Sequence, residues 1–587
     1  MKKSWLKYLS FLLLAILFSN CRNNNSEVAD LVLKNGYIYT VDSLQTVAEA
    51  VAVKDEKIIF VGKDLNVEKF IGLSTKVIDL KKKLVLPGFI DSHCHPAYGA
   101  AHQLFDVMLN GLKSVKEYQK AIKNFADAHP NDKYIKGRGW VNTLFGKTGP
   151  DKKLIDEIVN DRPVVISDDG GHAKWVNSKT LELAGITKYT KDPEGGVIER
   201  DPKTGEPTGT LRENAADLVN KIFPDYTVDQ LEKAIESYQK MAASFGITTS
   251  HDASVDVDGN DFNAYRNLEQ DKKLSMRFRS SLYVDPEKDT EQIKSIIADR
   301  EKCKGKLFQA NSAKIFIDGV IEGSTGYLKA PYKHLPNSYG EFLWKKDKLN
   351  KVCAELDKNK FQIHVHSIGD AATSVTLDAF GYAVDKNGKR DSRNSITHLQ
   401  LVDQKDFQRF KELGVVALPQ PYWFAKDDYY YNIQVPYLGQ KRADEEYPMK
   451  SFFDAGVVVA SASDYAVTIP CNPLNAIQSG ITRSKLDVTD PKEILWPEER
   501  VSLEQMIQSF TINGAYANFL EKETGSIEVG KSADMIVLDK NLFEIPVTEI
   551  SKAKVLLTIF KGRETFKKKS FVFKSPSLRE RLGWAYL

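Results

Sequence analysis

Cysteine is scarce in this chain, with five in 587 residues. Cys94, Cys303, Cys353 and Cys471 are widely spaced and form no CxxC pattern, which argues against a disulfide framework. An excess of one charge is also missing, because 82 Lys and Arg stand against 79 Asp and Glu, for a net charge of +3. This near balance gives no sign of a surface for nucleic acid. A composition of 42% hydrophobic and 27% charged residues predicts an ordinary globular protein.

Long apolar runs are absent except for LSFLLLAILFSN, which follows Lys2, Lys3 and Lys7 and ends just before Cys21. The run is shorter than the roughly 20 apolar residues of a transmembrane helix, and its basic start predicts a secretory signal peptide over residues 1–20. The position of Cys21 resembles the lipobox of bacterial lipoproteins. That resemblance implies a lipidated Cys21, a tether over 21–29 and a lipid-anchored protein on the periplasmic or outer-surface side of the cell envelope. Asn20 is unusual at this position, so an ordinary signal peptide with an incidental cysteine stays open.

Apolar and polar residues alternate near both ends of the remaining chain, a pattern typical of β-strands. The segments are DLVLKNGYIYTVD, AVAVKDEKIIFVG and KVIDLKKKLVLPG near the start, and ADMIVLD and KVLLTIFKG near the end. We expect residues 30–87 and 525–587 to form one discontinuous small β-sandwich domain.

Between these ends, strand-like and helix-like segments alternate, which is typical of βαβ units and a parallel sheet. Eight short buried strands predict an α/β fold, a (β/α)₈ TIM-type barrel over residues 88–524. About 150 residues separate the first two strands, too many for one connection, and the stretch at about 130–225 predicts an inserted subdomain with its own strands. The eight candidates are GFIDSHCHP near Phe89, GITTSHDAS near Ile247, MRFRSSLYVD near Phe278, SAKIFIDG near Ile315, FQIHVHSIGD near Ile363, SITHLQ near Ile396, VVALPQP near Val416 and VVVASASD near Val458.

Metal-ligating residue types occur at the ends of these strands, where barrel enzymes place their active sites. His93 and His95 flank Cys94 at the end of the first strand, and alternate residues of a strand share a face. Each histidine alone is more often a core residue, but the set together predicts a site for Zn²⁺ or a similar divalent metal. The later members are Lys314 on the fourth strand, His364 and His366 on the fifth, His398 at the end of the sixth and Asp464 at the end of the eighth.

Motifs along nearly the whole mature chain resemble the amidohydrolase superfamily, and within it amidohydrolase family 3, which includes N-substituted formamide deformylases. The matching stretches are LPGFIDSHCHP, GRGW, GGHAKWVNSKTLELAGI, GGVIERDPKTGEPTGTLRE, KIFIDGVIEGSTGYL, HVHSIGDAA, ITHLQ, SASDYAV and GSIEVGKSADMIVLD.

The resemblance implies a role for each candidate ligand. His93 and His95 would hold the more buried metal, and His366 and His398 would be further ligands. Lys314 would bridge two metals as a carboxylated lysine if the site is binuclear, and a carbamate would also remove the cost of burying its charge. Asp464 would be both ligand and general base. His364 would lie behind the ligands or in the core.

Four further motifs suggest contacts with a substrate. His172 in GGHAKWVN would contact the substrate carbonyl as a catalytic residue, or else order a loop. Arg212 in TGTLRE and Asp318 in FIDG would line the pocket or form structural salt bridges. Tyr422 and Trp423, in the aromatic segment PQPYWFAKDDYYYN, would line a pocket for an apolar or aromatic group or pack over the barrel rim.

These features favour a metal-dependent amidohydrolase that cleaves a non-peptide C–N bond of a small-molecule amide or N-substituted formamide. Two alternatives stay open: a catalytically silent binding lipoprotein on the same scaffold, or the same fold acting on an ester, a cyclic amide or an aromatic amine. The stretch GSIEVGKS matches the consensus of a phosphate-binding loop, which needs a strand before it and a helix after it. Here a helix-like stretch precedes and a strand follows, so we expect no nucleotide. The oligomeric state stays open, with a homodimer as one alternative.

Overall fold

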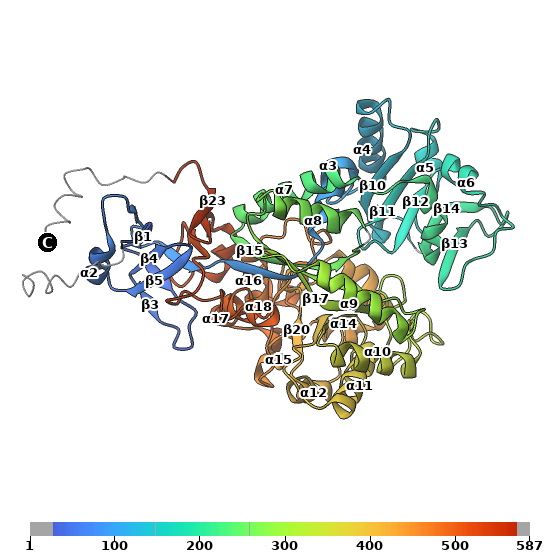
Figure 1. Ribbon diagram of the computed structural model, residues 1–587. Coiled ribbons are helices and arrows are strands. Elements are labelled where there is room, and N and C mark those ends of the chain that lie inside the picture. Colours follow the sequence, from blue (N-terminus) through green and yellow to red (C-terminus); the bar gives the residue numbers. More distant parts are fainter. Residues whose placement is uncertain (1–27, 147, 258, 572–587) are drawn as a thin grey trace, which may run out of the picture.

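The computed structural model describes residues 28–146, 148–257 and 259–571 (Figure 1). The predicted signal peptide 1–20, Cys21 and most of the tether therefore lie outside the described residues. Among the described helices, none combines the length and the apolar character needed to span a bilayer.

Seven parallel strands form the central sheet in the order β20-β19-β18-β17-β16-β15-β8. Most of their residues are buried, which explains why these strands lack a strict alternation of polar and apolar residues. The sheet is a nearly closed TIM-type α/β barrel, as the strand count predicted. The strands are β8 (Phe89–Cys94), β15 (Ile247–Val255), β16 (Arg277–Tyr283), β17 (Phe308–Phe316), β18 (Gln362–Ser367), β19 (Ser395–His398) and β20 (Val416–Leu418).

The eighth predicted strand, near Val458, is not a regular strand. It is an extended segment with one parallel bridge, between Ala417 and Val459. On one side the N–H of Ala417 donates to Val458 O at 3.0 Å, and on the other the N–H of Ser92 donates to Ser461 O at 3.2 Å. The segment therefore closes the ring between β20 and β8. Its N–H at Ser461 bonds instead to Ser509 O, which interrupts the ladder.

Helices follow the strands and pack around the barrel (Figure 1). The longest before the second barrel strand, α7 (Val228–Ser244), begins with a capping box between Thr227 and Gln230, which satisfies free N–H groups at its first turn. Further helices of the ring are α3 (Pro96–Phe105), α8 (Asn260–Gln270), α9 (Ile293–Lys302), α10 (Lys346–Lys358), α11 (Asp370–Asn387), α12 (Asp406–Leu413) and α16 (Pro473–Thr482).

A separate six-stranded sheet, in the order β13-β14-β12-β11-β10-β9, lies between β8 and β15 in the chain. Helix α4 (Val115–Ala128) packs on it through Tyr118 and Ile122. This unit begins at Val107, ahead of residue 130 in the predicted insertion. Its strands are β9 (Val107–Met108), β10 (Ile135–Trp140), β11 (Val164–Asp168), β12 (Ala173–Val176), β13 (Gly196–Arg200) and β14 (Pro207–Glu213).

Strands from both chain ends lie side by side at the end of the molecule away from the inserted sheet (Figure 1). One sheet has the order β5-β4-β1-β6 and the other β23-β22-β21-β7-β2-β3. Leu33 and Val51 of the first sheet share a core with Met535 and Leu557 of the second. The strands are β1 (Leu31–Lys34), β2 (Tyr37–Tyr39), β3 (Val47–Ala48), β4 (Ala50–Lys54), β5 (Lys57–Gly62), β6 (Lys76–Asp79), β7 (Leu84–Pro87), β21 (Met535–Leu538), β22 (Val555–Phe560) and β23 (Arg563–Lys567).

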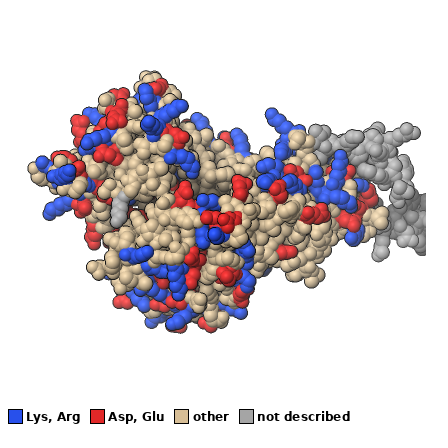
Figure 2. All heavy atoms as spheres, turned by 180° about the vertical axis from the view of Figure 1, so that it is seen from behind, with Lys and Arg blue, Asp and Glu red and all other residues tan. Residues whose placement is uncertain are grey.

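The charged side chains agree with the balanced composition. On the face seen in Figure 2, basic and acidic residues are interspersed, with no large area of a single sign.

Candidate metal centre and its neighbouring cavity

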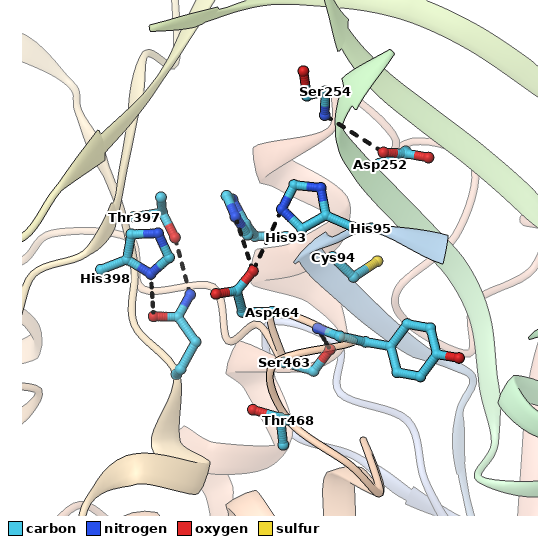
Figure 3. Close-up of polar contacts among 12 residues, drawn as sticks. His93, Cys94, His95, Asp252, Ser254, Thr397, His398, Ser463, Asp464 and Thr468 are labelled. Carbon is cyan, nitrogen blue, oxygen red and sulfur yellow. Dashed lines mark hydrogen bonds and ion pairs between the residues drawn. The ribbon is translucent and has the colours of Figure 1, made fainter. Parts of the chain in front are cut away.

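Asp464 follows the closing segment near Val458 and lies beside the end of β8, the first barrel strand. Its Oδ1 lies 3.4 Å from Nε2 of His93 and 3.5 Å from Nε2 of His95, and both rings point toward it in Figure 3. The N–H of Asp464 donates to His93 O at 2.8 Å. A ring nitrogen of each histidine therefore approaches the same carboxylate oxygen.

His398 and His366 lie beside this group. Ligand atoms of His93, His398 and Asp464 all fall within 4.8 Å of one another, and the rings of His366 and His398 are 4.6 Å apart. Burial lowers the pKa of His95 to about 4 and that of His366 to about 3. The imidazoles are therefore neutral at pH 7, which is the form that binds metal.

Lys314 is buried, with 1% of its surface exposed, and lies on β17. Among the described residues its Nζ has no ion-pair partner, and it sits 4.6 Å from the centroid of the Phe316 ring. Burial lowers the pKa of Lys314 to about 7. Burial of this amine without an ion-pair partner has a free-energy cost.

The candidate ligands are held from behind. His93 Nδ1 and His364 Nε2 are 2.6 Å apart, so one donates to the other, and His93 Nε2 is left facing Asp464. Gln420 Oε1 lies 3.2 Å from His398 Nδ1. Asp91 accepts the N–H of Ser463 at 2.9 Å. The partners of His93 and His398 are of the kind that fixes the tautomer and orientation of metal-binding histidines.

The backbone of two candidate ligands is strained. His398 has φ 72° and Asp464 has φ 55°, a left-handed conformation that side chains other than glycine rarely adopt. Such outliers persist where the surrounding structure requires them, often at functional sites.

His172 lies on the inserted unit and lines a cavity of about 290 Å³. Its Nδ1 is 3.1 Å from Glu213 Oε2. Burial lowers the pKa of His172, but the hydrogen bond and charge of Glu213, together with Asp168 and Glu322, outweigh it and raise the pKa to about 9. His172 is therefore a cation at neutral pH.

The comparisons with known proteins agree with this geometry. The model of the amidohydrolase family matches residues 76–566. Protein LONG AFTER FAR-RED 3 of Arabidopsis thaliana is 32% identical over 550 residues, 92% of each chain. The N-substituted formamide deformylase of Arthrobacter pascens is 26% identical over 549 residues, 92% of this chain and 98% of its own. A solved structure of an uncharacterised metal-dependent hydrolase from Pyrococcus furiosus is 27% identical and covers 87% of this chain and 99% of its own, with a TM-score of 0.66.

This chain belongs to the amidohydrolase family. It is accordingly a hydrolase that acts on carbon–nitrogen bonds, and its barrel mouth carries groups that suit a divalent metal.

Besides His172, four residues were predicted to contact the substrate of this amidohydrolase, and they lie in different surroundings. Arg212 lines the cavity beside His172, and its Nε donates to Glu199 at 2.7 Å. Trp423 stacks over His398, with centroids 5.8 Å apart. Asp318 accepts N–H groups of residues 327, 368 and 369, and its Oδ1 lies 3.8 Å from Nε2 of His366. The buried hydroxyl of Tyr422 has no hydrogen-bond partner among the described residues, and its ring packs near Phe510.

Sequence reasoning missed several residues around the centre. Asp91 shares the face of His93 on β8, so the two-residue period could have found it. Gln420 lies two residues after the end of β20, close to a strand end where functional groups are expected. The pairing of His172 with Glu213 had no signal, since it joins positions 41 residues apart.

The proton on His172 predicts a pH-dependent stability. The folded-state pKa of about 9 lies above the ordinary 6.5, so the stabilisation is complete below pH 6.5 and is lost as the pH rises through about 9. We expect the wild type to melt above a His172→Gln variant at about pH 6, and this difference to vanish by about pH 10. Melting curves across this range provide the check, and a difference that does not change with pH would contradict it.

Proposed function

We propose that this amidohydrolase cleaves the C–N bond of a non-peptide amide or N-substituted formamide, with Zn²⁺ as the metal and Asp464 as the general base. The observation that carries the proposal is the convergence of His93 and His95 on one oxygen of Asp464, at 3.4 and 3.5 Å. Neutral imidazoles and a carboxylate are the donor set that zinc prefers. The likeness to a formamide deformylase supports the bond type.

Lys314 supports a second metal. Its buried amine has no ion-pair partner among the described residues, and it lies on β17, next to the strand that carries His366. As a carbamate it would offer two oxygens and lose the cost of a buried ammonium. We propose that Lys314, carboxylated by addition of CO₂ to its amine, would help to hold a second divalent ion, with His93, His95, His366, His398 and Asp464 as the other ligands of the pair.

The chemistry follows from the positions of the side chains. A bound divalent ion lowers the pKa of water toward 7 and polarises a carbonyl. Asp464 takes the proton of the attacking water and returns it to the leaving nitrogen as the C–N bond breaks. His172, charged at neutral pH, donates a hydrogen bond to the substrate carbonyl or to a group beside it.

A substrate panel tests the proposal against its alternatives. The metal-loaded protein is assayed on N-substituted formamides, other amides, lactams and esters. Turnover of the open-chain amides or formamides is the expected result. Preference for esters or lactams would show that this enzyme hydrolyses a different bond. Binding without turnover of any member would favour the silent binding lipoprotein.

We also propose that the protein is lipid-anchored in the cell envelope through Cys21, on the evidence of the N-terminal sequence alone. A Cys21→Ser variant is expected to move from the membrane fraction to the soluble fraction. Equal distribution of variant and wild type would contradict the anchor.

A further inference from the structure

The cavity beside His172 lies between the inserted sheet and the loop that follows β17. Asp168 at the end of β11 and Glu213 at the end of β14 form one side, and Glu322 and Thr325 form the other. Glu341 completes the acidic lining. The space of about 290 Å³ is sufficient for a small group of a substrate but not for a macromolecule.

The loop connects this cavity to the metal centre. Nε2 of His366 lies 3.1 Å from the carbonyl oxygen of Gly319. Gly319 in turn donates its N–H to Thr325 O, at 3.3 Å. Glu322 sits within this turn, so its carboxylate is three residues from a backbone group that contacts a candidate ligand. The cavity and the candidate metal centre therefore share this loop.

The charges of the cavity do not cancel. The imidazolium of His172 is matched by Glu213 at 3.1 Å, and the guanidinium of Arg212 by Glu199 at 2.7 Å. Asp168, Glu322 and Glu341 are left, and none of them has an ion-pair partner among the described residues. The cavity therefore has more carboxyl groups than cations paired with them.

Asp168 indicates which kind of ligand would suit these carboxyl groups. It is 2% exposed, and its Oδ1 accepts the N–H of Ala173 at 2.9 Å. Its Oδ2 has no hydrogen-bond partner in the part of the chain that the structure describes, although the residue lines the cavity. Burial raises the pKa of Glu322 to about 7, with the charge of Asp169 adding to it. A ligand with N–H donors and positive charge would bond to the free oxygen of Asp168 and favour the ionised form of Glu322.

We propose that this cavity is the subsite for a positively charged group of the substrate, a primary ammonium or guanidinium carried on the amide. Charge-assisted hydrogen bonds from such a group to Asp168 and Glu322 fit both the unmatched charge and the free acceptor. The inference deepens the proposed function, since it names the class of substrate for the same metal centre. Neutral and anionic amides would lack this contact.

Binding of small probes tests the subsite without turnover. n-Butylammonium, butyramide and butanoate are titrated into the metal-loaded full-length protein and followed by ligand-observed NMR. We expect n-butylammonium to bind at least about tenfold more tightly than the other two. A Glu322→Gln variant should lose this preference about tenfold, while Glu498→Gln, at an exposed position, should keep it. Glu341→Gln serves as a second variant if Glu322→Gln does not fold.

The outcomes separate the subsite from the catalytic proposal. Equal binding of the three probes, or a preference unchanged in both cavity variants, would overturn the subsite even if amides are hydrolysed. Selective ammonium binding in a protein that hydrolyses no member of the panel would retain the subsite and remove the hydrolase. Where both hold, kcat/KM for aminoalkyl amides should exceed that for their uncharged isosteres.

Discussion

An Asp464→Asn variant is expected to lose about 10³-fold in kcat while it retains metal, because an amide keeps an oxygen ligand but cannot accept the proton of water. The distances of 3.4 and 3.5 Å from Asp464 to His93 and His95 put its carboxylate beside two candidate ligands, as both proposed roles require. Steady-state kinetics and metal analysis on the same sample measure the two effects separately.

The control for this experiment is Asp385→Asn, which removes a carboxylate at an exposed position of α11. It should have wild-type kinetics. Full activity in Asp464→Asn would exclude Asp464 as the base. Loss of metal together with activity would assign Asp464 a ligand role alone.

If Lys314 carries the proposed carbamate, a Lys314→Ala variant is expected to lose at least about 100-fold in kcat and one of two bound ions, because a ligand of the second ion is removed. The truncation leaves a space in the barrel, and added propanoate supplies a carboxylate of similar reach. We therefore expect propanoate to restore part of the activity and the second ion.

Two comparisons make the Lys314 result decisive. Lys306→Ala, at an exposed position, should be unaffected and should not respond to propanoate. A Lys314→Ala variant with an unchanged metal content and unchanged kcat would contradict the proposed role of Lys314, as would the absence of an added 44 Da on wild-type Lys314 in native mass spectrometry of the loaded protein.

The barrel was predictable because its strands combine burial on both faces with helical stretches between them. The segment near Val458 was predicted as a regular strand by the same reasoning, but it lacks a regular hydrogen-bond ladder. Its small residues suit a strand, but Ser461 bonds to Ser509, and that pairing depends on a distant part of the chain. Local sequence cannot show that a buried extended segment will lack a ladder.

The candidate site was predictable for a related reason. Ends of parallel strands meet at one mouth, so residues such as His93 and His398 are brought together by topology alone. Contacts behind the ligands depend on side-chain packing instead. Thus the stacking of His364 on His93, 4.8 Å between centroids, and the pair His172–Glu213 required the three-dimensional structure.

We expect this barrel to hold catalytic metal, and metal stoichiometry by ICP-MS will show whether it does. The measurement uses soluble protein that starts after Cys21, expressed without added chelator. We expect about two divalent ions per chain, and about one ion would retain the hydrolase but exclude the proposed role of Lys314 in holding a second ion. A folded protein with almost no metal, which added zinc does not restore, would exclude a metal-dependent hydrolase.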